Sequence, residues 1–329
     1  MSEALFWSRE KNGVRCNLCA WNCFVAKGKK GYCEVRENKN NKLISLNFGK
    51  LTSIETVEIE KIPLFHFYPG TKTLSIKSFG RNLRGQFFAN EILKEKGREI
   101  KEFAPEDVVE EAEKERVRSI TFGGDAEVYF EFAYKVARFA HRSNLATVFC
   151  THGYVEEEPI KKIAKYLDAA QINIIASADP DFYKRFIGID DISPIFTTLK
   201  QLRKQRVFIE ITNLIVTKLG DNLELCRKLA ERINTELYSE IPFHLLQFHP
   251  GYGLLELPKT PLRTLEKCAE EARRAGLRYV YISNVEHELN NTYCYNCREL
   301  LISRRKKLKI KLIGDRCPTC GLRINLVRE

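Results

Sequence analysis

The sequence predicts an α/β fold, a parallel sheet closed or partly closed into a barrel, with a small cysteine-rich module at each end of the chain. Between residues 70 and 285, strand-like and helix-like segments alternate, which is typical of parallel strands joined by crossover helices. The eleven cysteines include two quartets near the chain ends. A length of 329 residues accommodates one barrel-sized domain with small attachments.

The alternating segments follow one another without interruption. We expect strands at residues 73–76, 119–122, 146–149, 169–175, 207–211, 243–248 and 279–282. We expect helices from Pro105 through Ala112, at residues 129–139 and 156–166, through Leu199 and Leu202, and at residues 223–233 and 262–275. This order predicts a partial TIM-like (β/α)6 barrel, whose functional sites lie on the loops that follow the strands.

The chain divides into three expected regions. Residues 1–65 hold the first cysteine quartet and short strand-like runs such as residues 43–48. Residues 66–285 form the barrel, and residues 286–329 hold the second quartet. No internal repeat and no low-complexity linker separates them.

Composition indicates a soluble globular protein, with 44% hydrophobic and 29% charged residues. No stretch of 18 apolar residues occurs, so we expect no membrane span and no membrane partner. Residues 1–8 lack the basic and apolar runs of a secretory signal, and we therefore expect a cytoplasmic protein. The net charge of +11 fits an RNA, ribosomal or acidic protein partner, and equally a solvated charged surface.

The C-terminal quartet consists of two CxxC pairs separated by 19 residues: Cys294, Cys297, Cys317 and Cys320. Two such pairs can place four thiolates tetrahedrally around one ion. A tail of this length buries too little core to fold alone, so metal binding would supply its folding free energy. We expect a structural zinc ribbon. The alternatives are a rubredoxin-like iron site and reduced cysteines without a ligand.

The N-terminal quartet has wider and less regular spacing: Cys16, Cys19, Cys23 and Cys33. We expect it to bind a metal, with zinc preferred over an iron–sulfur cluster because no other redox group is evident in the sequence. Structural disulfides are the alternative. The isolated Cys150, Cys226 and Cys268 lie in apolar or amphipathic segments and are expected to be small buried side chains.

Several motifs occur in an order that resembles a known family. They lie at residues 14–19, 31–36, 59–70, 211–215, 242–244 and 248–252, and in the tail from Cys294 to Cys320. Together they resemble the radical S-adenosylmethionine (SAM) proteins of the AmmeMemoRadiSam group, which are similar to pyruvate formate-lyase activating enzymes. The resemblance covers nearly the whole chain and implies a radical-SAM-type barrel.

The chain departs from this family at the loop after the first barrel strand. The family has CxxxCxxC there, and the three thiolates hold a [4Fe–4S] cluster that chelates and reduces SAM. In this chain Arg81, Gly85 and Phe88 stand at those positions, and none can ligate iron. The Asp-Leu-Lys run that ends the family's fourth strand is also replaced, by residues 173–175. We therefore expect no [4Fe–4S] cluster at this position and no SAM.

Polar residues near the strand ends form a candidate ligand site at the barrel mouth: Asp125, His152, Asn213, His244 and His249. Histidines with a carboxylate there could bind a metal or perform acid–base chemistry. For each histidine alone, a hydrogen-bonded structural role is the alternative. Asp125 could likewise simply cap the following helix.

A basic run lies between the two C-terminal CxxC pairs and includes Arg304, Arg305, Lys306, Lys307 and Lys309. On a rigid ribbon such residues would contact RNA phosphates, whereas a solvated hairpin is the alternative. In the former cluster loop, Arg81 and Arg84 could hold an anion or form salt bridges with the barrel.

These observations favour a catalytically inactive, metal-binding, radical-SAM-like scaffold. It would act by binding RNA or the ribosome, or a protein partner. The family resemblance implies Memo-like or AMMECR-like partners. The alternative is an enzyme, either redox or SAM-dependent with an iron–sulfur cluster held outside the lost motif, or with non-radical chemistry at the barrel mouth.

Overall fold

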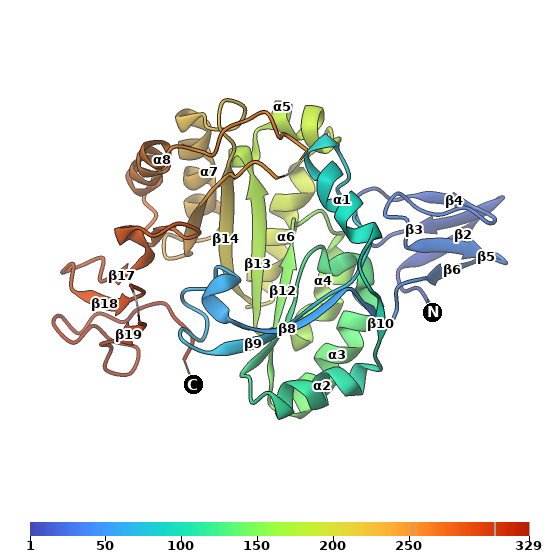
Figure 1. The fold of residues 1–329 in the computed structure, drawn as a ribbon, viewed down its shortest axis with the longest axis horizontal. Coiled ribbons are helices and arrows are strands. Elements are labelled where there is room, and N and C mark those ends of the chain that lie inside the picture. The colour runs from blue at the N-terminus through green and yellow to red at the C-terminus, as the bar shows by residue number, and fades with distance from the viewer. Residues whose placement is uncertain (252, 306, 329) are drawn as a thin grey trace.

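The computed structural model describes the whole chain except residues 252, 306 and 329 and the side chains of residues 93–96. An eight-stranded sheet forms its centre, in the order β16-β15-β14-β13-β12-β11-β9-β8. Small sheets extend from two opposite sides of this centre, the N-terminal one on one side and the C-terminal one on the other (Figure 1). No helix among the described residues is both long and apolar enough to cross a membrane.

Seven strands of the central sheet are parallel, and they neighbour one another in chain order. The antiparallel β8 pairs with β9 at one edge. The strands are β8 (Ser53–Glu58), β9 (Lys72–Lys77), β11 (Ser119–Phe122), β12 (Ala146–Thr151), β13 (Ala169–Ile175), β14 (Phe208–Ile215), β15 (Phe243–Gln247) and β16 (Val280–Ile282). Among the described strands, the edge strands β8 and β16 do not pair with each other. The α/β class with a parallel sheet is confirmed, and closure into a barrel stays a prediction.

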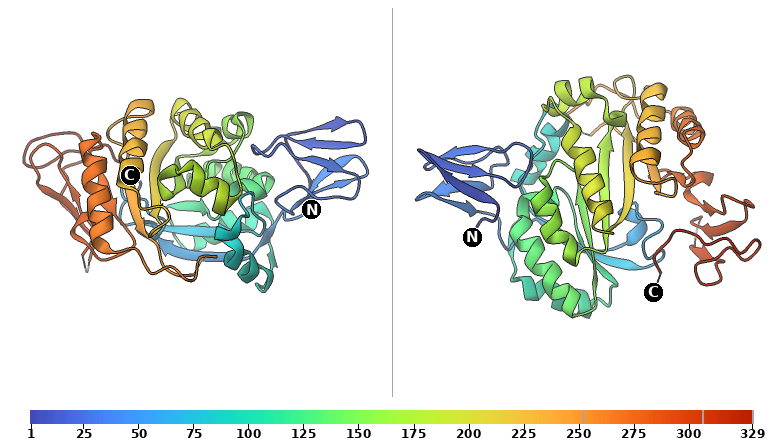
Figure 2. Two further views of the ribbon diagram at one scale, coloured as in Figure 1. Left: turned by 90° about the horizontal axis from the view of Figure 1, so that it is seen from above. Right: turned by 180° about the vertical axis from the view of Figure 1, so that it is seen from behind.

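Helices cover one face of the sheet, as Figure 2 shows from behind. Consecutive right-handed crossovers between neighbouring parallel strands place their helices on the same side. They are α2 (Pro105–Lys114), α3 (Phe130–Arg142), α4 (Glu157–Ile163), α6 (Ser193–Lys204), α7 (Leu223–Glu236) and α8 (Leu262–Arg274). The shorter α1 (Ala89–Lys96) and α5 (Pro180–Phe182) lie toward the carboxyl ends of the strands.

Local sequence accounts for the helix boundaries. Pro105 occupies the first turn of α2, and the Asp107 carboxylate accepts a hydrogen bond of 2.7 Å from the backbone N–H of Ala104. The Asn222 side chain caps α7 by accepting bonds from two backbone N–H groups of its first turn. Short 3-10 or π turns complete the connections: η1 (Ile59–Lys61), η2 (Gln86–Phe88), η3 (Ala126–Tyr129), η4 (Ala164–Tyr166), η5 (Ala176–Ala178), η6 (Tyr183–Ile187) and η7 (Glu288–Asn290).

The N-terminal module consists of two small antiparallel sheets. One contains β2 (Trp7–Glu10), β3 (Gly13–Cys16) and β4 (Phe24–Ala26), and the other β1 (Ser2–Glu3), β5 (Arg36–Lys39) and β6 (Lys42–Ser45). The strands β7 (Lys50–Leu51) and β10 (Lys101–Glu102) form a separate pair. A buried ion pair of 2.5 Å between Arg36 and Glu131 joins the module to α3.

The C-terminal module contains three short antiparallel strands, β17 (Thr292–Tyr293), β18 (Leu300–Ser303) and β19 (Lys309–Ile310). Its last residues return to the barrel, where Val327 forms a bridge with Phe67. Phe65, Tyr279 and Tyr281 of the barrel pack in one apolar cluster with Cys294 and Leu301 of the module. The tail is therefore packed against the central α/β domain rather than attached by a free linker.

A fully buried carboxylate organises the amino-terminal end of the sheet. Glu210 of β14 accepts hydrogen bonds from the backbone N–H groups of Phe65, His66 and Phe67, at 2.9, 2.8 and 3.0 Å, and one of 2.8 Å from His244 Nε2. Burial alone would raise the pKa of Glu210, but these donors lower it, so the group is ionised. The segment that enters the barrel is thus bound to the sheet through one side chain.

Candidate functional site

A cavity of about 620 Å³ opens at the carboxyl ends of the strands, and we call it the mouth cavity. The loops after β9, β11 and β12 contribute its charged wall, and β13 and β14 contribute Asn173 and Thr212. Functional sites of parallel α/β folds lie at this end of the sheet. Its ionisable members include Lys77, Arg81, Glu91, Asp125 and His152.

Arg81 lies in the loop after β9 and lines the mouth cavity. Its guanidinium lies 2.6 Å from the Glu91 carboxylate of α1 and 3.6 Å from that of Asp125, and it stacks 5.0 Å from the ring centre of Phe88. Phe88 is buried and packs edge-on against His152. The salt-bridge alternative for Arg81 is confirmed. Arg84 likewise pairs with Glu34 at 3.2 Å.

The backbone around Gly85 leaves no space for a side chain. A Cβ atom at this position would lie 2.3 Å from the carbonyl oxygen of Phe186 and 2.4 Å from the carbonyl carbon of Ile187. Both contacts are to main-chain atoms of the π turn η6, which cannot rotate away. A cysteine at position 85 would therefore require the loop or η6 to move.

Two buried carboxyl groups lie beside this loop. Asp125 is 5% exposed and Glu127 is fully buried. Among the described residues, neither Asp125 oxygen has a hydrogen-bond partner, since Arg81 at 3.6 Å and His152 Nε2 at 3.8 Å are too distant. Asp125 precedes η3 but makes no side-chain capping bond, so the interpretation of Asp125 as a helix cap is wrong.

Glu127 is the more strongly perturbed of the two carboxyl groups. Burial, followed by the charge of Asp125, raises its pKa to about 8. Thr151 and Asn82 lie near its carboxyl group, but no well-aligned hydrogen bond joins them to it. Glu127 is therefore mostly protonated at neutral pH and able to donate a proton or a hydrogen bond.

His152 is placed by the end of β12. Burial lowers its pKa against the opposing attraction of Asp125, so the ring is neutral. Its Nδ1 lies 3.0 Å from the backbone oxygen of Asn173, which can only accept, so Nδ1 carries the proton. The free lone pair on Nε2 consequently faces Asp125 and the mouth cavity.

The structure brings together only part of the predicted ligand site. Asp125 and His152 line the mouth cavity. His244 is the second residue of β15, fully buried at the opposite end of the sheet, where it binds Glu210, so its placement at the mouth is wrong. Asn213 is also fully buried and bonds to Ser177 through both amide atoms. His249 is exposed and does not line the cavity.

Sequence reasoning missed Glu91, Lys77 and Thr212 as members of the mouth cavity. Lys77 and Thr212 each directly follow a predicted strand, at residues 73–76 and 207–211, and lie within the longer observed strands β9 and β14. Alternation along a strand of the observed length could have indicated which of them face inward. Glu91 lies on α1, a helix that the sequence analysis did not predict. Only a prediction of that helix would have placed Glu91 near Arg81.

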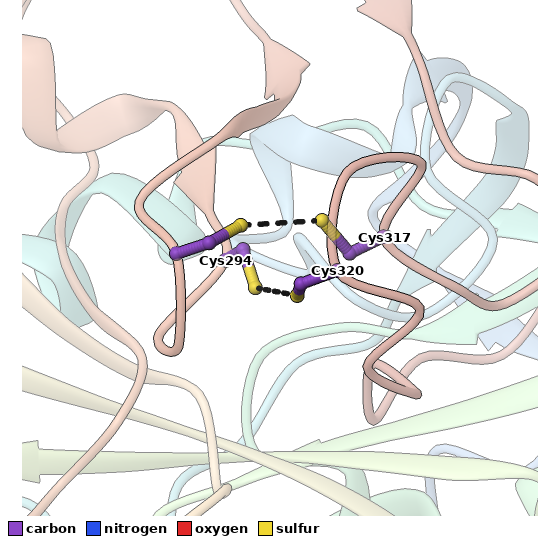
Figure 3. Close-up of side chains that lie close together, drawn as sticks. Cys294, Cys317 and Cys320 are labelled. Carbon is purple, nitrogen blue, oxygen red and sulfur yellow. Dashed lines mark hydrogen bonds between the residues drawn. The ribbon is translucent and has the colours of Figure 1, made fainter.

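The C-terminal quartet forms a compact group of thiols (Figure 3). The four sulfur atoms all lie within 4.8 Å of one another, and the pairs Cys294–Cys320 and Cys297–Cys317 are each 3.6 Å apart. A tetrahedral ion with Zn–S bonds of about 2.3 Å would separate its sulfurs by about 3.8 Å. The prediction that these cysteines meet is confirmed, and the group can hold one metal ion.

The N-terminal quartet is arranged differently. All four cysteines line one small cavity, together with Arg36 and the barrel residue Glu127. Within the part of the chain that the structure describes, the C-terminal group alone places three or more such donor atoms within 4.8 Å of one another. The four N-terminal cysteines therefore share a cavity, but among the described residues no three of their sulfur atoms lie within 4.8 Å of one another.

The basic run does not form one continuous exposed surface. Arg304 is largely buried, lies over the ring of Phe65 at 4.2 Å, and donates to Thr292 Oγ1 at 2.8 Å, so its prediction as a nucleic-acid contact is wrong. The neighbouring Arg305, by contrast, is exposed, as are Lys307 and Lys309. Lys306 lies outside the described residues.

Comparison with known proteins finds one close relative over the whole chain. The uncharacterized protein MJ0808 of Methanocaldococcus jannaschii is 37% identical over 343 aligned residues, which cover 99% of this chain and 100% of the relative. No protein-family model matches the chain.

Solved structures match less closely. A domain of pyruvate-formate lyase-activating enzyme from Bacteroides vulgatus has a TM-score of 0.44 and 14% identity, covering 50% of this chain and 98% of its own. SuiB of Streptococcus suis has a TM-score of 0.48 and 14% identity, covering 68% of this chain and 49% of its own. A structure of anSMEcpe with bound AdoMet and a peptide has a TM-score of 0.48 and 13% identity, covering 68% and 70%. At these values the similarity assigns neither a ligand nor a reaction.

Proposed function

Because the chain belongs to the same family as MJ0808 of Methanocaldococcus jannaschii, whose activity its description leaves open, we propose a function from the site itself. We propose that the protein is a radical-SAM-like, metal-binding scaffold that does not cleave SAM and acts by binding a partner. The motifs of the chain resemble those of the AmmeMemoRadiSam group, and the chain departs from that pattern at the positions that radical chemistry requires.

The loop after β9 carries this proposal. A [4Fe–4S] cluster needs three thiolates there, and the residues present do not fit it. Arg81 is bound between two carboxylates, Phe88 is packed in the apolar interior, and position 85 has no room for a side chain. Side chains without a donor atom cannot ligate iron.

The C-terminal quartet would hold zinc in this scaffold. Its sulfur separations of 3.6 Å suit a single tetrahedral ion, and a zinc ion there would supply structural stability without taking part in chemistry. Rubredoxin-like iron is the alternative for the same donor set. Cys294 and Cys317 are buried in the cluster that joins the module to the barrel, so the ion would fix the tail in place.

We further propose that the partner is RNA, free or in the ribosome, bound by the exposed cations of the C-terminal module. Arg305, Lys307 and Lys309 are exposed on the C-terminal module, and Lys311 pairs with Glu299. Cations on a rigid ribbon bind phosphates by releasing counterions. A protein partner, Memo-like or AMMECR-like as the resemblance implies, is the alternative.

The test of partner binding is a binding curve with fluorescent single-stranded RNA at several salt concentrations. We expect affinity to fall steeply with salt, and the triple variant Arg305→Ala/Lys307→Ala/Lys309→Ala to bind at least tenfold more weakly. The matched control Lys27→Ala/Lys29→Ala/Lys30→Ala removes three cations from the opposite module. Equal affinity of both variants, or purification with a discrete protein free of RNA, would contradict RNA binding.

One observation favours a second function. Asp125 and the neutral His152 both line the mouth cavity, which suits non-radical acid–base chemistry on a small molecule bound there. Turnover of a candidate substrate that is lost in Asp125→Asn, with unchanged RNA binding, would establish this alternative.

A further inference from the structure

The mouth cavity carries an excess of positive charge. Among the described residues that line it, four are basic and two are acidic: Lys61, Lys77, Arg81, Arg98, Glu91 and Asp125. Because the ring of His152 is neutral, this lining attracts an anion and disfavours a cationic ligand. We therefore expect the ligand of this cavity to be negatively charged.

Two hydrogen-bond acceptors at the wall of the cavity lack donors. Asp125 is 5% exposed, and neither of its carboxyl oxygens has a hydrogen-bond partner among the described residues. His152 donates from Nδ1 to the backbone oxygen of Asn173, so its Nε2 is also an acceptor, 3.8 Å from Asp125 Oδ1. Two acceptors cannot bond to each other, so both require a ligand that supplies donors.

We propose that the mouth cavity binds a phosphorylated sugar, whose neighbouring hydroxyl groups donate to Asp125 and His152 and whose phosphate lies against Lys77 and Arg98. Neighbouring hydroxyls supply two donors side by side, as the two acceptors require. A phosphate monoester carries nearly two negative charges at pH 7, which balances the excess charge of the lining. The inference rests on the cavity of the second proposed function and names its ligand class.

The loop after β11 joins the two halves of this site. A Cβ atom at Gly123 would lie 3.1 Å from Cε and Cγ of Lys77, so the Lys77 side chain passes beside Gly123. Asp125 follows two residues later, a span of about 7 Å at most. At Gly124 a Cβ atom would meet no atom within 4 Å, so the backbone between them borders open space. Lys77 and Asp125 are thus within reach of one small molecule.

Lys77 and Arg98 stand where the cavity opens outward. Both also line an adjoining groove of about 520 Å³, which contains Lys101, Glu55 and Glu99 as well. The Lys77 side chain is 40% exposed, and its ion pair with Glu55 is long, at 4.0 Å. A phosphate here would keep part of its hydration, whereas the sugar hydroxyls would satisfy the buried Asp125. The cavity of about 620 Å³ has room for such a molecule.

The test is equilibrium binding of ribose 5-phosphate to the full chain by isothermal titration calorimetry. We expect a Kd below about 1 mM. Two matched probes should bind at least about tenfold more weakly. They are 2-deoxyribose 5-phosphate, which lacks neighbouring hydroxyls in its ring form, and ribose, which lacks the phosphate.

Variants assign the two halves of the ligand to residues. Asp125→Asn should weaken ribose 5-phosphate binding about tenfold and leave binding of 2-deoxyribose 5-phosphate nearly unchanged. Lys77→Ala should remove the preference for ribose 5-phosphate over ribose. The matched control Lys165→Ala changes an exposed lysine of η4 that does not line the cavity, and it should bind all probes as the natural chain does.

Three results would overturn the proposal: no binding of ribose 5-phosphate at about 10 mM to the folded chain, equal affinity for its 2-deoxy analogue, or tighter binding of SAM, whose ribose has neighbouring hydroxyls but whose sulfonium is positive. If Asp125→Asn does not fold, His152→Phe removes the second acceptor and should show the same loss. Binding is measured without turnover and without RNA. Retained sugar phosphate binding without any turnover would contradict the acid–base function alone.

Discussion

The buried carboxyl groups at the two ends of the central sheet differ in their hydrogen bonding. At the amino-terminal end, Glu210 is fully buried and accepts four hydrogen bonds. At the carboxyl end, Asp125 and Glu127 are as deeply buried, but within the described chain their oxygens have no well-aligned hydrogen-bond partner. A buried polar group without hydrogen-bond partners lowers the free energy of unfolding. The arrangement of Asp125 and Glu127 therefore destabilises the fold.

This contrast indicates that one end of the sheet provides stability and the other is available for a ligand. In parallel α/β folds, loops at the carboxyl ends of the strands carry function, while the other end carries the structural connections. Here the structural end also binds the tail, because Arg304 and His66 donate to backbone oxygens of Phe65 and Asn325. Four predictions can break or sharpen the comparison.

The largest effect is expected at Glu210. Glu210→Ala would leave three buried backbone N–H groups and His244 without their acceptor, and we expect the free energy of unfolding to fall by about 3–5 kcal/mol. Denaturant unfolding measures this loss. The control Glu210→Gln keeps the size and one acceptor oxygen and should lose less. A loss below about 1 kcal/mol in the alanine variant would refute the structural role of this end.

A smaller loss is expected at the mouth, at Gly85. Gly85→Ala forces a methyl group against the backbone of residues 186–187, and we expect a loss of about 2 kcal/mol. Gly97→Ala is the matched control, because its Cβ would meet no atom within 4 Å. Thermal unfolding of both variants compares them. Equal stability of the two would show that position 85 can accommodate a cysteine.

Lowering the pH should reduce the free energy of unfolding through His66, at the amino-terminal end of the sheet. Burial lowers the pKa of His66 to about 4, despite the neighbouring Glu210, so its folded pKa lies below the value of about 6.5 expected in the unfolded chain. Between these values the unfolded state binds the extra proton, so stability falls as pH falls. From pH 7 to pH 5 this group should remove about 2 kcal/mol. In His66→Gln the pH dependence should be shallower, and an unchanged slope would contradict the assignment.

The smallest effect is expected for Glu127→Gln. Since the raised pKa of about 8 keeps Glu127 mostly neutral at pH 7, an amide of the same size should change the free energy of unfolding by less than about 1 kcal/mol. Denaturant unfolding at pH 7 beside Glu210→Gln makes the comparison direct. If Glu127→Gln lowers the free energy of unfolding as much as Glu210→Gln does, the buried carboxyl groups at the two ends of the sheet contribute alike to stability.

Sequence patterns predicted most of the sheet. The expected strands at residues 119–122 and 169–175 coincide with β11 and β13, and the helix from Pro105 begins where α2 begins. Sequence patterns did not indicate β8 as a member of the central sheet, because its antiparallel pairing with β9 is a contact that local alternation does not reveal. They also did not indicate α1, which follows the altered cluster loop directly.

The candidate site was predicted less completely than the fold. Chemistry readable from residue type was identified, namely the meeting of the C-terminal cysteines and the lack of donor atoms at positions 81, 85 and 88. The position of a residue along its strand was not identified from the sequence. His244 was therefore assigned to the wrong end of β15. Burial of Arg304 depends on how the ribbon packs against Phe65, which no local pattern encodes.

The central claim is that the loop after β9 holds no SAM-cleaving cluster. The most direct measurement is the yield of 5′-deoxyadenosine when anaerobically reconstituted protein is incubated with SAM and dithionite. We predict no product above a protein-free control, whatever the N-terminal quartet binds. Product formed in at least stoichiometric amount, and retained in Cys19→Ser/Cys23→Ser, would place an active cluster in the barrel and contradict it.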